Sequence, residues 1–129
     1  MGKRILVFFT LLLTTGFAFS QTKQDYDAAI NKFQTFYNKK QPENIYNMFS
    51  QRVQSAMTLD KTKEMVTTMH RDLGEIKAHT FIKQDDQFSF YKLDYAKGGR
   101  LILVVCLNKE NLFQNFRYNE YHTDYDKLR

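Results

Sequence analysis

The side chains of this sequence best suited to ligand chemistry are five polar residues in its C-terminal half. They are Thr80, Tyr91, Tyr95, Asn115 and Arg117. A guanidinium holds a carboxylate or phosphate with two parallel hydrogen bonds, and tyrosine hydroxyls together with a side-chain amide orient a bound molecule. We therefore expect these five residues to line a ligand pocket. The alternative is that Asn115 and Arg117 meet solvent at a sheet margin while the tyrosines are ordinary core residues.

Patterns typical of catalysis or metal binding are weak by comparison. Asp85 and Asp86 occupy a turn, where Asp is expected for its own backbone hydrogen bonds, and no carboxylate is forced into the apolar interior. His70, His79 and His122 lack the spacing of metal ligands. The sequence contains no glycine-rich phosphate loop and no nucleophile elbow. It therefore predicts no catalytic residue, no metal and no cofactor.

The first 20 residues have the pattern of a secretory signal peptide. Lys3 and Arg4 precede a short apolar run, and Ala18-Phe19-Ser20 offers small residues at the cleavage positions. We expect cleavage after Ser20 and a secreted or periplasmic protein. The alternative is an uncleaved membrane anchor, but a spanning helix needs about 20 apolar residues and this run is shorter. No membrane span is expected in the mature chain.

Cleavage would leave 109 residues, which suits one domain. Without Lys3 and Arg4 the chain has 17 basic residues against 14 acidic ones, a net charge of about +3. The lysines and arginines are scattered, so a nucleic-acid partner is not predicted. Cys106 is the only cysteine, which excludes an intrachain disulfide, and its apolar neighbours predict a buried side chain.

The periodicity of apolar residues changes from helical to alternating at Gly74. Helices are predicted over residues 22–38, from Pro42, and from a possible N-cap at Asp60 to Gly74, with residues 50–57 as an irregular exit from the second. Four antiparallel strands follow at about 75–83, 88–96, 101–107 and 112–118, and residues 119–129 are predicted to be a strand extension that frays into a mobile tail. The predicted fold is α+β, with three N-terminal helices packed on a curved four-stranded antiparallel meander.

Pairing the predicted strands through their turns assigns residues to the two faces of this sheet. Tyr91 comes opposite Cys106, and Ile102 comes opposite Arg117, on the face that also carries the pocket candidates. We assign this face to the helices because its apolar residues run through all four strands. The opposite face keeps an apolar patch that is predicted to bind a partner or a second copy of the chain: Leu101, Leu103, Val105, Leu107, Leu112, Phe116 and Tyr118. The assignment depends on an uninterrupted alternation of side chains along each strand, since a single bulge exchanges the faces of the residues beyond it.

Several local strings resemble a family of unknown function found in secreted bacterial proteins, alone or ahead of serine-hydrolase domains. The strings are Phe36-Tyr-Asn38, Ile45-Tyr-Asn-Met-Phe-Ser50, Leu73-Gly-Glu-Ile76 and Tyr91-Lys-Leu-Asp-Tyr95. The likeness covers nearly all of residues 26–118 and implies an NTF2-like, or cystatin-like, fold in which a bent sheet wraps helices into a cone. Together with the N-terminal pattern and the polar C-terminus, the likeness predicts a signal peptide (1–20), an NTF2-like domain (21–118) and a polar C-terminal tail (119–129). It supplies no catalytic positions.

Together these features favour a secreted, non-catalytic NTF2-like module that binds a small or peptidic ligand or an envelope partner and dimerises through its sheet. One alternative is a small pocket enzyme of the isomerase or hydratase type, with Tyr91, Tyr95 and Arg117 polarising an apolar substrate. Another is an accessory protein that regulates a secreted hydrolase.

Overall fold

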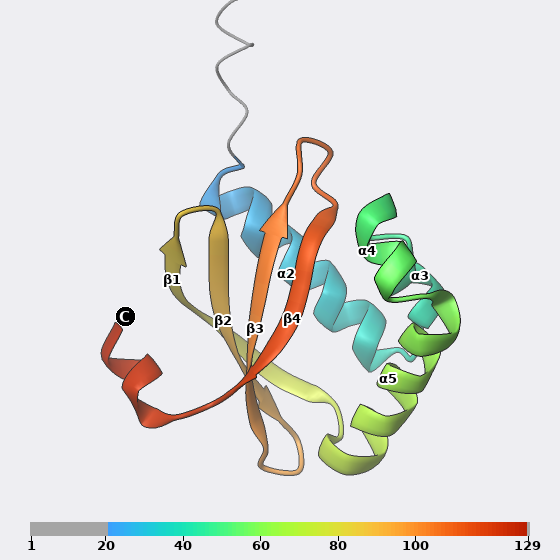
Figure 1. The fold of residues 1–129 in the computed structure, drawn as a ribbon. Coiled ribbons are helices and arrows are strands. Elements are labelled where there is room, and N and C mark those ends of the chain that lie inside the picture. Colours follow the sequence, from blue (N-terminus) through green and yellow to red (C-terminus); the bar gives the residue numbers. More distant parts are fainter. Residues whose placement is uncertain (1–20, 129) are drawn as a thin grey trace, which may run out of the picture.

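Helices come first along the chain and strands follow. The computed structural model describes residues 21–128, so the predicted signal peptide lies outside the described residues. The elements are α2 (Lys23–Asn38), α3 (Pro42–Tyr46), α4 (Gln51–Ala56), α5 (Leu59–Leu73), β1 (Ile76–Asp85), β2 (Phe88–Tyr95), β3 (Arg100–Leu107), β4 (Phe113–Glu120) and the 3₁₀ helix η1 (Thr123–Leu128). The strands lie side by side in chain order in one antiparallel sheet, with the long helix α2 behind it (Figure 1). This confirms the predicted α+β fold.

The first long helix begins as its sequence predicts. The Thr22 hydroxyl accepts a hydrogen bond from the Asp25 N–H at 3.2 Å, and the Asp25 carboxylate accepts one from the Thr22 N–H at 2.9 Å. This capping box satisfies N–H groups that the first turn leaves unpaired. Pro42 opens α3 where its fixed φ suits a helix, and Gly74, with a φ of 82°, ends α5.

Two helix predictions are wrong. The N-cap of α5 is Thr58, whose hydroxyl accepts from the Lys61 N–H at 3.3 Å, and Asp60 lies within the first turn. The supposedly irregular stretch 50–57 contains the short helix α4, capped by Ser50. Only Val53 of this helix is buried, so its six residues carry too little apolar periodicity to be recognised.

The predicted pairing of β2 with β3 is also wrong. The chain turns sooner than predicted: the Tyr95 N–H donates to Gly99 O at 2.9 Å, and Gly98 adopts a φ of 93°. Asp94 therefore pairs with Arg100, and Tyr91 pairs with Leu103 instead of Cys106. A shift by an odd number of residues exchanges the two faces of β3 relative to β2.

The residues predicted to form a partner surface therefore belong to the protein's own core. Leu103 and Val105 are completely buried beneath the helices, and Phe116 packs edge-on against Phe33 of α2 with ring centroids 5.4 Å apart. Leu101, Leu107 and Tyr118 lie in the same cluster, and Leu112 is partly buried in the β3–β4 loop. The predicted dimer surface is wrong because helices cover it.

The opposite face of the sheet is covered by the C-terminus of the same chain. Ile82, Ile102 and Val104 are buried there, and Tyr121 and Tyr125 pack against them. We call residues 121–128 the C-terminal strap. Lys92 holds it by an ion pair with Asp126 at 3.1 Å, and Tyr121 hydrogen-bonds to the same carboxylate. The predicted strand extension is confirmed as far as Glu120, but Thr123–Leu128 form η1, which packs on the sheet.

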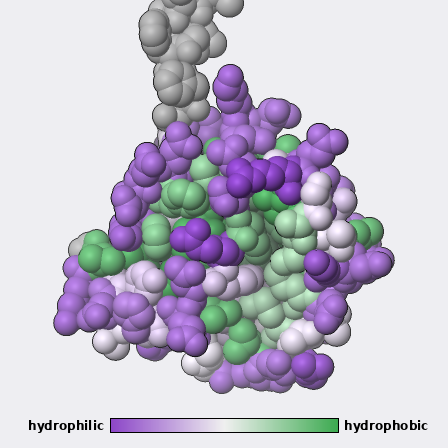
Figure 2. Space-filling view, in the orientation of Figure 1, coloured by the Kyte–Doolittle hydropathy of each residue, from purple (hydrophilic) through white to green (hydrophobic). Residues whose placement is uncertain are grey.

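With the strap in place, the surface on this side of the sheet has apolar residues near its centre and polar residues around them. Figure 2 shows this side of the molecule as green apolar patches bordered by purple polar residues. Among the described residues, Leu128 is the only large hydrophobic side chain that is mostly exposed. Within residues 21–128, no helix combines the length and the apolar character that a membrane crossing requires.

Candidate functional site

The five residues predicted to line one pocket do not share a face. Tyr91 and Tyr95 point into the core beneath the helices. The partners of the other three lie on the opposite face: Thr80 pairs with Lys92, Asn115 with Cys106 and Arg117 with Val104. The Arg117 guanidinium lies 5.5 Å from the centroid of the Phe88 ring, on the exterior of the sheet. The prediction of a common pocket is therefore wrong.

The space between the helices and the sheet is filled by side chains. Tyr37 and Tyr95 meet edge to face with centroids 5.9 Å apart, and the buried Tyr91 hydroxyl donates to Asp27 Oδ1 at 2.7 Å. Burial raises the pKa of Tyr95, and burial and the Asp27 hydrogen bond raise the pKa of Tyr91, so both phenols stay protonated. The arrangement that the isomerase or hydratase alternative needs, with these tyrosines beside Arg117, is not formed.

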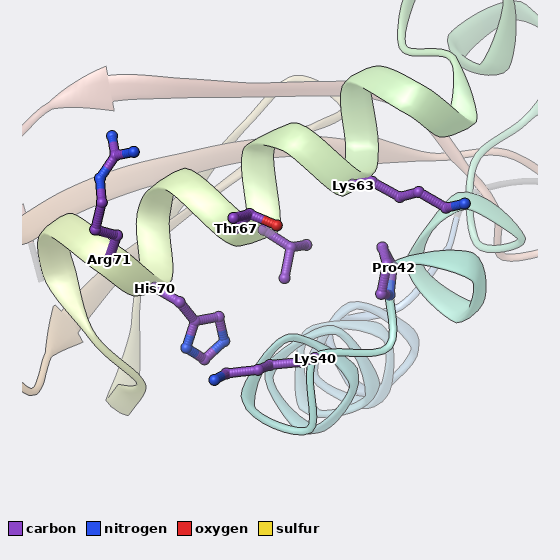
Figure 3. A pocket seen from close by; sticks show the side chains of 7 residues that line it. Lys40, Pro42, Lys63, Thr67, His70 and Arg71 are labelled. Carbon is purple, nitrogen blue, oxygen red and sulfur yellow. The ribbon is translucent and has the colours of Figure 1, made fainter.

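A solvent-open groove instead lies between α5 and the connection from α2 to α3. It has a volume of about 540 Å³ and is lined by Lys40, Pro42, Lys63, Val66, Thr67, His70 and Arg71. The α5 residues recur at intervals of three and four, so one face of the helix presents them all. Figure 3 shows Lys40 and Pro42 opposite α5, with Lys40 pointing toward His70 and the Arg71 side chain directed away from both. We call this feature the basic groove.

Tyr37, which is buried beneath the groove, contacts residues of both of its walls. The His70 ring stacks on the Tyr37 ring at 4.3 Å with an interplanar angle of 13°, and His70 Nε2 lies 2.6 Å from Tyr37 O. The same carbonyl accepts a hydrogen bond from the Lys40 N–H at 3.0 Å, and Lys40 has a left-handed φ of 56°. One buried residue thus positions side chains on both walls.

The charge of the groove has one sign. Lys40, Lys63 and Arg71 are exposed cations, and no carboxylate belongs to the lining. Arg71 also contacts its neighbour Asp72 at 3.0 Å, and this hydrogen bond holds the pKa of Asp72 below its usual value. A cleft lined by charge of one sign concentrates ligands of the other sign. The chemistry that this geometry supports is recognition of an anion.

The sequence contains a signal for this groove that composition alone does not show. Lys63, Thr67, His70 and Arg71 fall on one stripe of α5 beside the buried Val66. Lys40 and Lys39 form the densest basic pair after residue 20. Their meeting depends on how the turn after α2 packs against α5, which only the tertiary structure specifies.

One other predicted side-chain position can be checked. Cys106 is buried as predicted, and its Sγ accepts a hydrogen bond from Gln114 Nε2 at 3.3 Å. In the part of the chain that the structure describes, no three His, Cys, Asp or Glu side chains gather in a way that could hold a metal ion.

The fold and the groove define a small α+β module with an open basic groove. The chain belongs to the DUF3887 family, described as a protein of unknown function, and the match covers residues 30–116. The matched range runs from within α2 to within β4, so it includes the basic groove and most of the sheet. A search of curated proteins and a search of solved structures each return no match.

Proposed function

We propose that this chain is an exported, non-catalytic binding module of NTF2-like shape whose basic groove holds an acidic peptide segment of an envelope partner. The observation that carries the proposal is the grouping of Lys40, Lys63 and Arg71 around one groove whose lining contains no carboxylate. In this proposal residues 1–20 are the signal peptide and residues 21–118 the binding domain.

A peptide fits the groove better than a small inorganic anion. The volume of about 540 Å³ falls within the range of about 300–1,000 Å³ that is usual for ligand sites, and it far exceeds the volume of a phosphate. Pro42 and Val66 give the lining an apolar part beside the cations. This combination suits acidic side chains with an apolar neighbour.

The expected affinity is modest because the cations are exposed. An exposed ion pair contributes about 0.2–1 kcal/mol, so three pairs contribute about 0.6–3 kcal/mol, or about 3- to 160-fold in affinity. Salt must weaken the complex, because the Debye length is only about 10 Å at 0.1 M ionic strength.

An NMR titration of residues 21–129 tests the proposal. The probe is a capped tetrapeptide of three glutamates and one leucine, and the same peptide with glutamines is the uncharged control. We expect saturable shifts of backbone amides around residues 40–43 and 63–71 with the acidic peptide, and much weaker binding of the control. Equal binding of both peptides, or shifts elsewhere, would show that the groove is not an acidic-peptide site. Displacement by equimolar phosphate would show a site for any anion.

A pair of triple variants separates local charge from net charge. Lys40→Asn, Lys63→Gln and Arg71→Gln remove the groove cations, with Asn chosen because it tolerates the left-handed backbone at position 40. Lys32→Gln, Arg52→Gln and Lys77→Gln remove the same number of exposed cations elsewhere. Only the first triple should lose binding; equal losses in both would reduce the effect to net charge.

Export is tested separately. The protein recovered from the periplasm or medium of a bacterial host should begin at Gln21 by N-terminal sequencing. A chain that stays in the cytoplasm and begins at Met1 would contradict this part of the proposal.

A further inference from the structure

A second recess lies at the other end of α2 from the basic groove. Its volume is about 630 Å³, and side-chain amides from separate segments line it. Gln21 precedes α2, Gln84 and Gln87 come from the β1–β2 hairpin, and Asn108 and Gln114 flank the β3–β4 loop. We call it the amide cleft. The 16 residues of α2, about 24 Å of helix, separate it from Lys40. In Figure 1 the segments that carry its lining, the tips of the two hairpins and the start of α2, lie at the same end of the molecule.

The walls of the cleft are held together by a buried tyrosine. The Tyr26 hydroxyl donates to Gln87 O at 2.7 Å and accepts from the Leu107 N–H at 3.0 Å. It therefore joins α2, the β1–β2 hairpin and the end of β3 at one point. The cleft is formed before any ligand arrives, which lowers the cost of binding.

Cys106 positions two of the amides from beneath. Its Sγ lies 3.3 Å from Gln114 Nε2 and 3.8 Å from Gln87 Oε1. The other atoms of these amides, Gln114 Oε1 and Gln87 Nε2, have no hydrogen-bond partner among the described residues. One acceptor and one donor thus remain for a ligand.

Asn108 adds a second donor. Its Oδ1 accepts from the N–H groups of Glu110 at 2.9 Å and Leu112 at 3.0 Å, which fixes the side chain in the loop. The Asn108 Nδ2 is therefore left for the cleft. Paired donors and acceptors on neighbouring amides are the complement of a peptide group, which presents one N–H and one C=O.

We propose that the amide cleft binds an extended, uncharged peptide segment through the segment's backbone amides. The rim carries charges of both signs, Asp86, Lys109 and Glu110, so it favours no net ligand charge. A glycan fits less well because the only ring in the lining belongs to Tyr26, which is 2% exposed and offers no face for a sugar to stack on. This site is independent of the basic groove.

The test observes the side-chain amides directly by ¹H–¹⁵N NMR. The probe is a capped, uncharged pentapeptide of serine and alanine added to residues 21–129 to about 10 mM, which covers even weak complexes. We expect saturable shifts of the side-chain NH₂ signals of Gln87, Asn108 and Gln114 and no shift of signals from the basic groove. Absence of saturable shifts would overturn the proposal. Shifts with N,N′-diacetylchitobiose and not with the peptide would replace it with a glycan site.

Matched double variants test which amides act. Gln87→Ala with Gln114→Ala removes two amides that the proposal assigns to the ligand, and Gln24→Ala with Asn31→Ala removes two from the exposed side of α2. Loss of about two hydrogen bonds should weaken peptide binding at least about fivefold in the first variant only. Unchanged affinity in the first variant, with its NMR spectrum still that of the folded protein, would contradict the proposal. The triple variant of the basic groove should bind this peptide normally, so the two sites fail or succeed separately.

Discussion

Deleting the C-terminal strap should change the energetic role of one core residue and leave its neighbour in sequence unaffected. Ile102 and Leu103 are both completely buried, but Ile102 lies under the strap and Leu103 lies under the helices. The perturbation is a chain that ends at Glu120, combined in turn with Ile102→Ala and Leu103→Ala. The two substitutions report on the two faces of β3.

The expected magnitudes follow from burial. In the intact chain each substitution should cost about 2–5 kcal/mol in the free energy of unfolding, the usual range for a buried Leu or Ile changed to Ala. Without the strap, the Ile102 side chain loses its cover of Tyr121 and Tyr125, so its substitution should cost about 1–3 kcal/mol less. The cost of Leu103→Ala should change by less than about 0.5 kcal/mol, because the strap lies on the other face.

Urea unfolding of the six chains, followed by circular dichroism, gives the required free energies. The pair of double-mutant cycles then isolates the coupling of each side chain to the strap. Equal coupling for both residues would refute the assignment of faces. Coupling of Leu103 alone would restore the pairing in which Ile102 faces the helices.

Two further predictions concern buried hydrogen bonds. Tyr26→Phe should lower the free energy of unfolding, measured by urea titration, by about 1–3 kcal/mol, because the Gln87 carbonyl and the Leu107 N–H lose their partner. Tyr46→Phe is the control and should change it by less than about 0.5 kcal/mol. Equal effects of the two substitutions would argue against the Tyr26 hydrogen bonds. For Asp27, burial opposes ionisation, but hydrogen bonds from Lys23 and Tyr91 outweigh it and hold the pKa of the carboxyl below its usual value. A lowered folded-state pKa stabilises the protein above the unfolded-state value, so Asp27→Asn should be less stable than wild type near pH 7, and the gap should close between about pH 5 and pH 2. A gap that widens on acidification would have the wrong sign.

The sequence could predict elements whose signals are local. Thr22 with Asp25, Pro42 and Gly74 mark helix ends by their own backbone chemistry, and the change of period after Gly74 separates helices from strands. These signals suffice for the fold class.

Face assignment beyond β2 failed because it depends on the conformation of one turn, whereas Thr80 was misplaced by the irregularity between Ile76 and Ala78 in β1. The residues of β3 are apolar on both sides, so nothing in Leu101–Leu107 itself distinguishes the helix face from the strap face. The left-handed Gly98 shortens the connection between β2 and β3, so the residues of β3 face the opposite side of the sheet from the one predicted. The pocket and surface residues predicted on β3 and β4 therefore also lie on the other face.

The candidate site was missed for a different reason. The cations of the basic groove come from the turn after α2 and from α5, and their sequence separation hides their proximity. The strap was missed because its two covering rings, Tyr121 and Tyr125, lie in an otherwise polar segment that a composition argument assigns to solvent.

The salt dependence of acidic-peptide binding tests the central claim most directly. Fluorescence anisotropy of a labelled acidic peptide would give dissociation constants at about 50 mM and about 500 mM NaCl, a range over which screening of exposed charges becomes nearly complete. We predict about tenfold weaker binding to the wild type at the higher salt concentration, and weak, salt-independent binding to the Lys40→Asn, Lys63→Gln, Arg71→Gln variant. Affinity that is independent of salt in the wild type, or equal salt dependence in both proteins, would contradict the account.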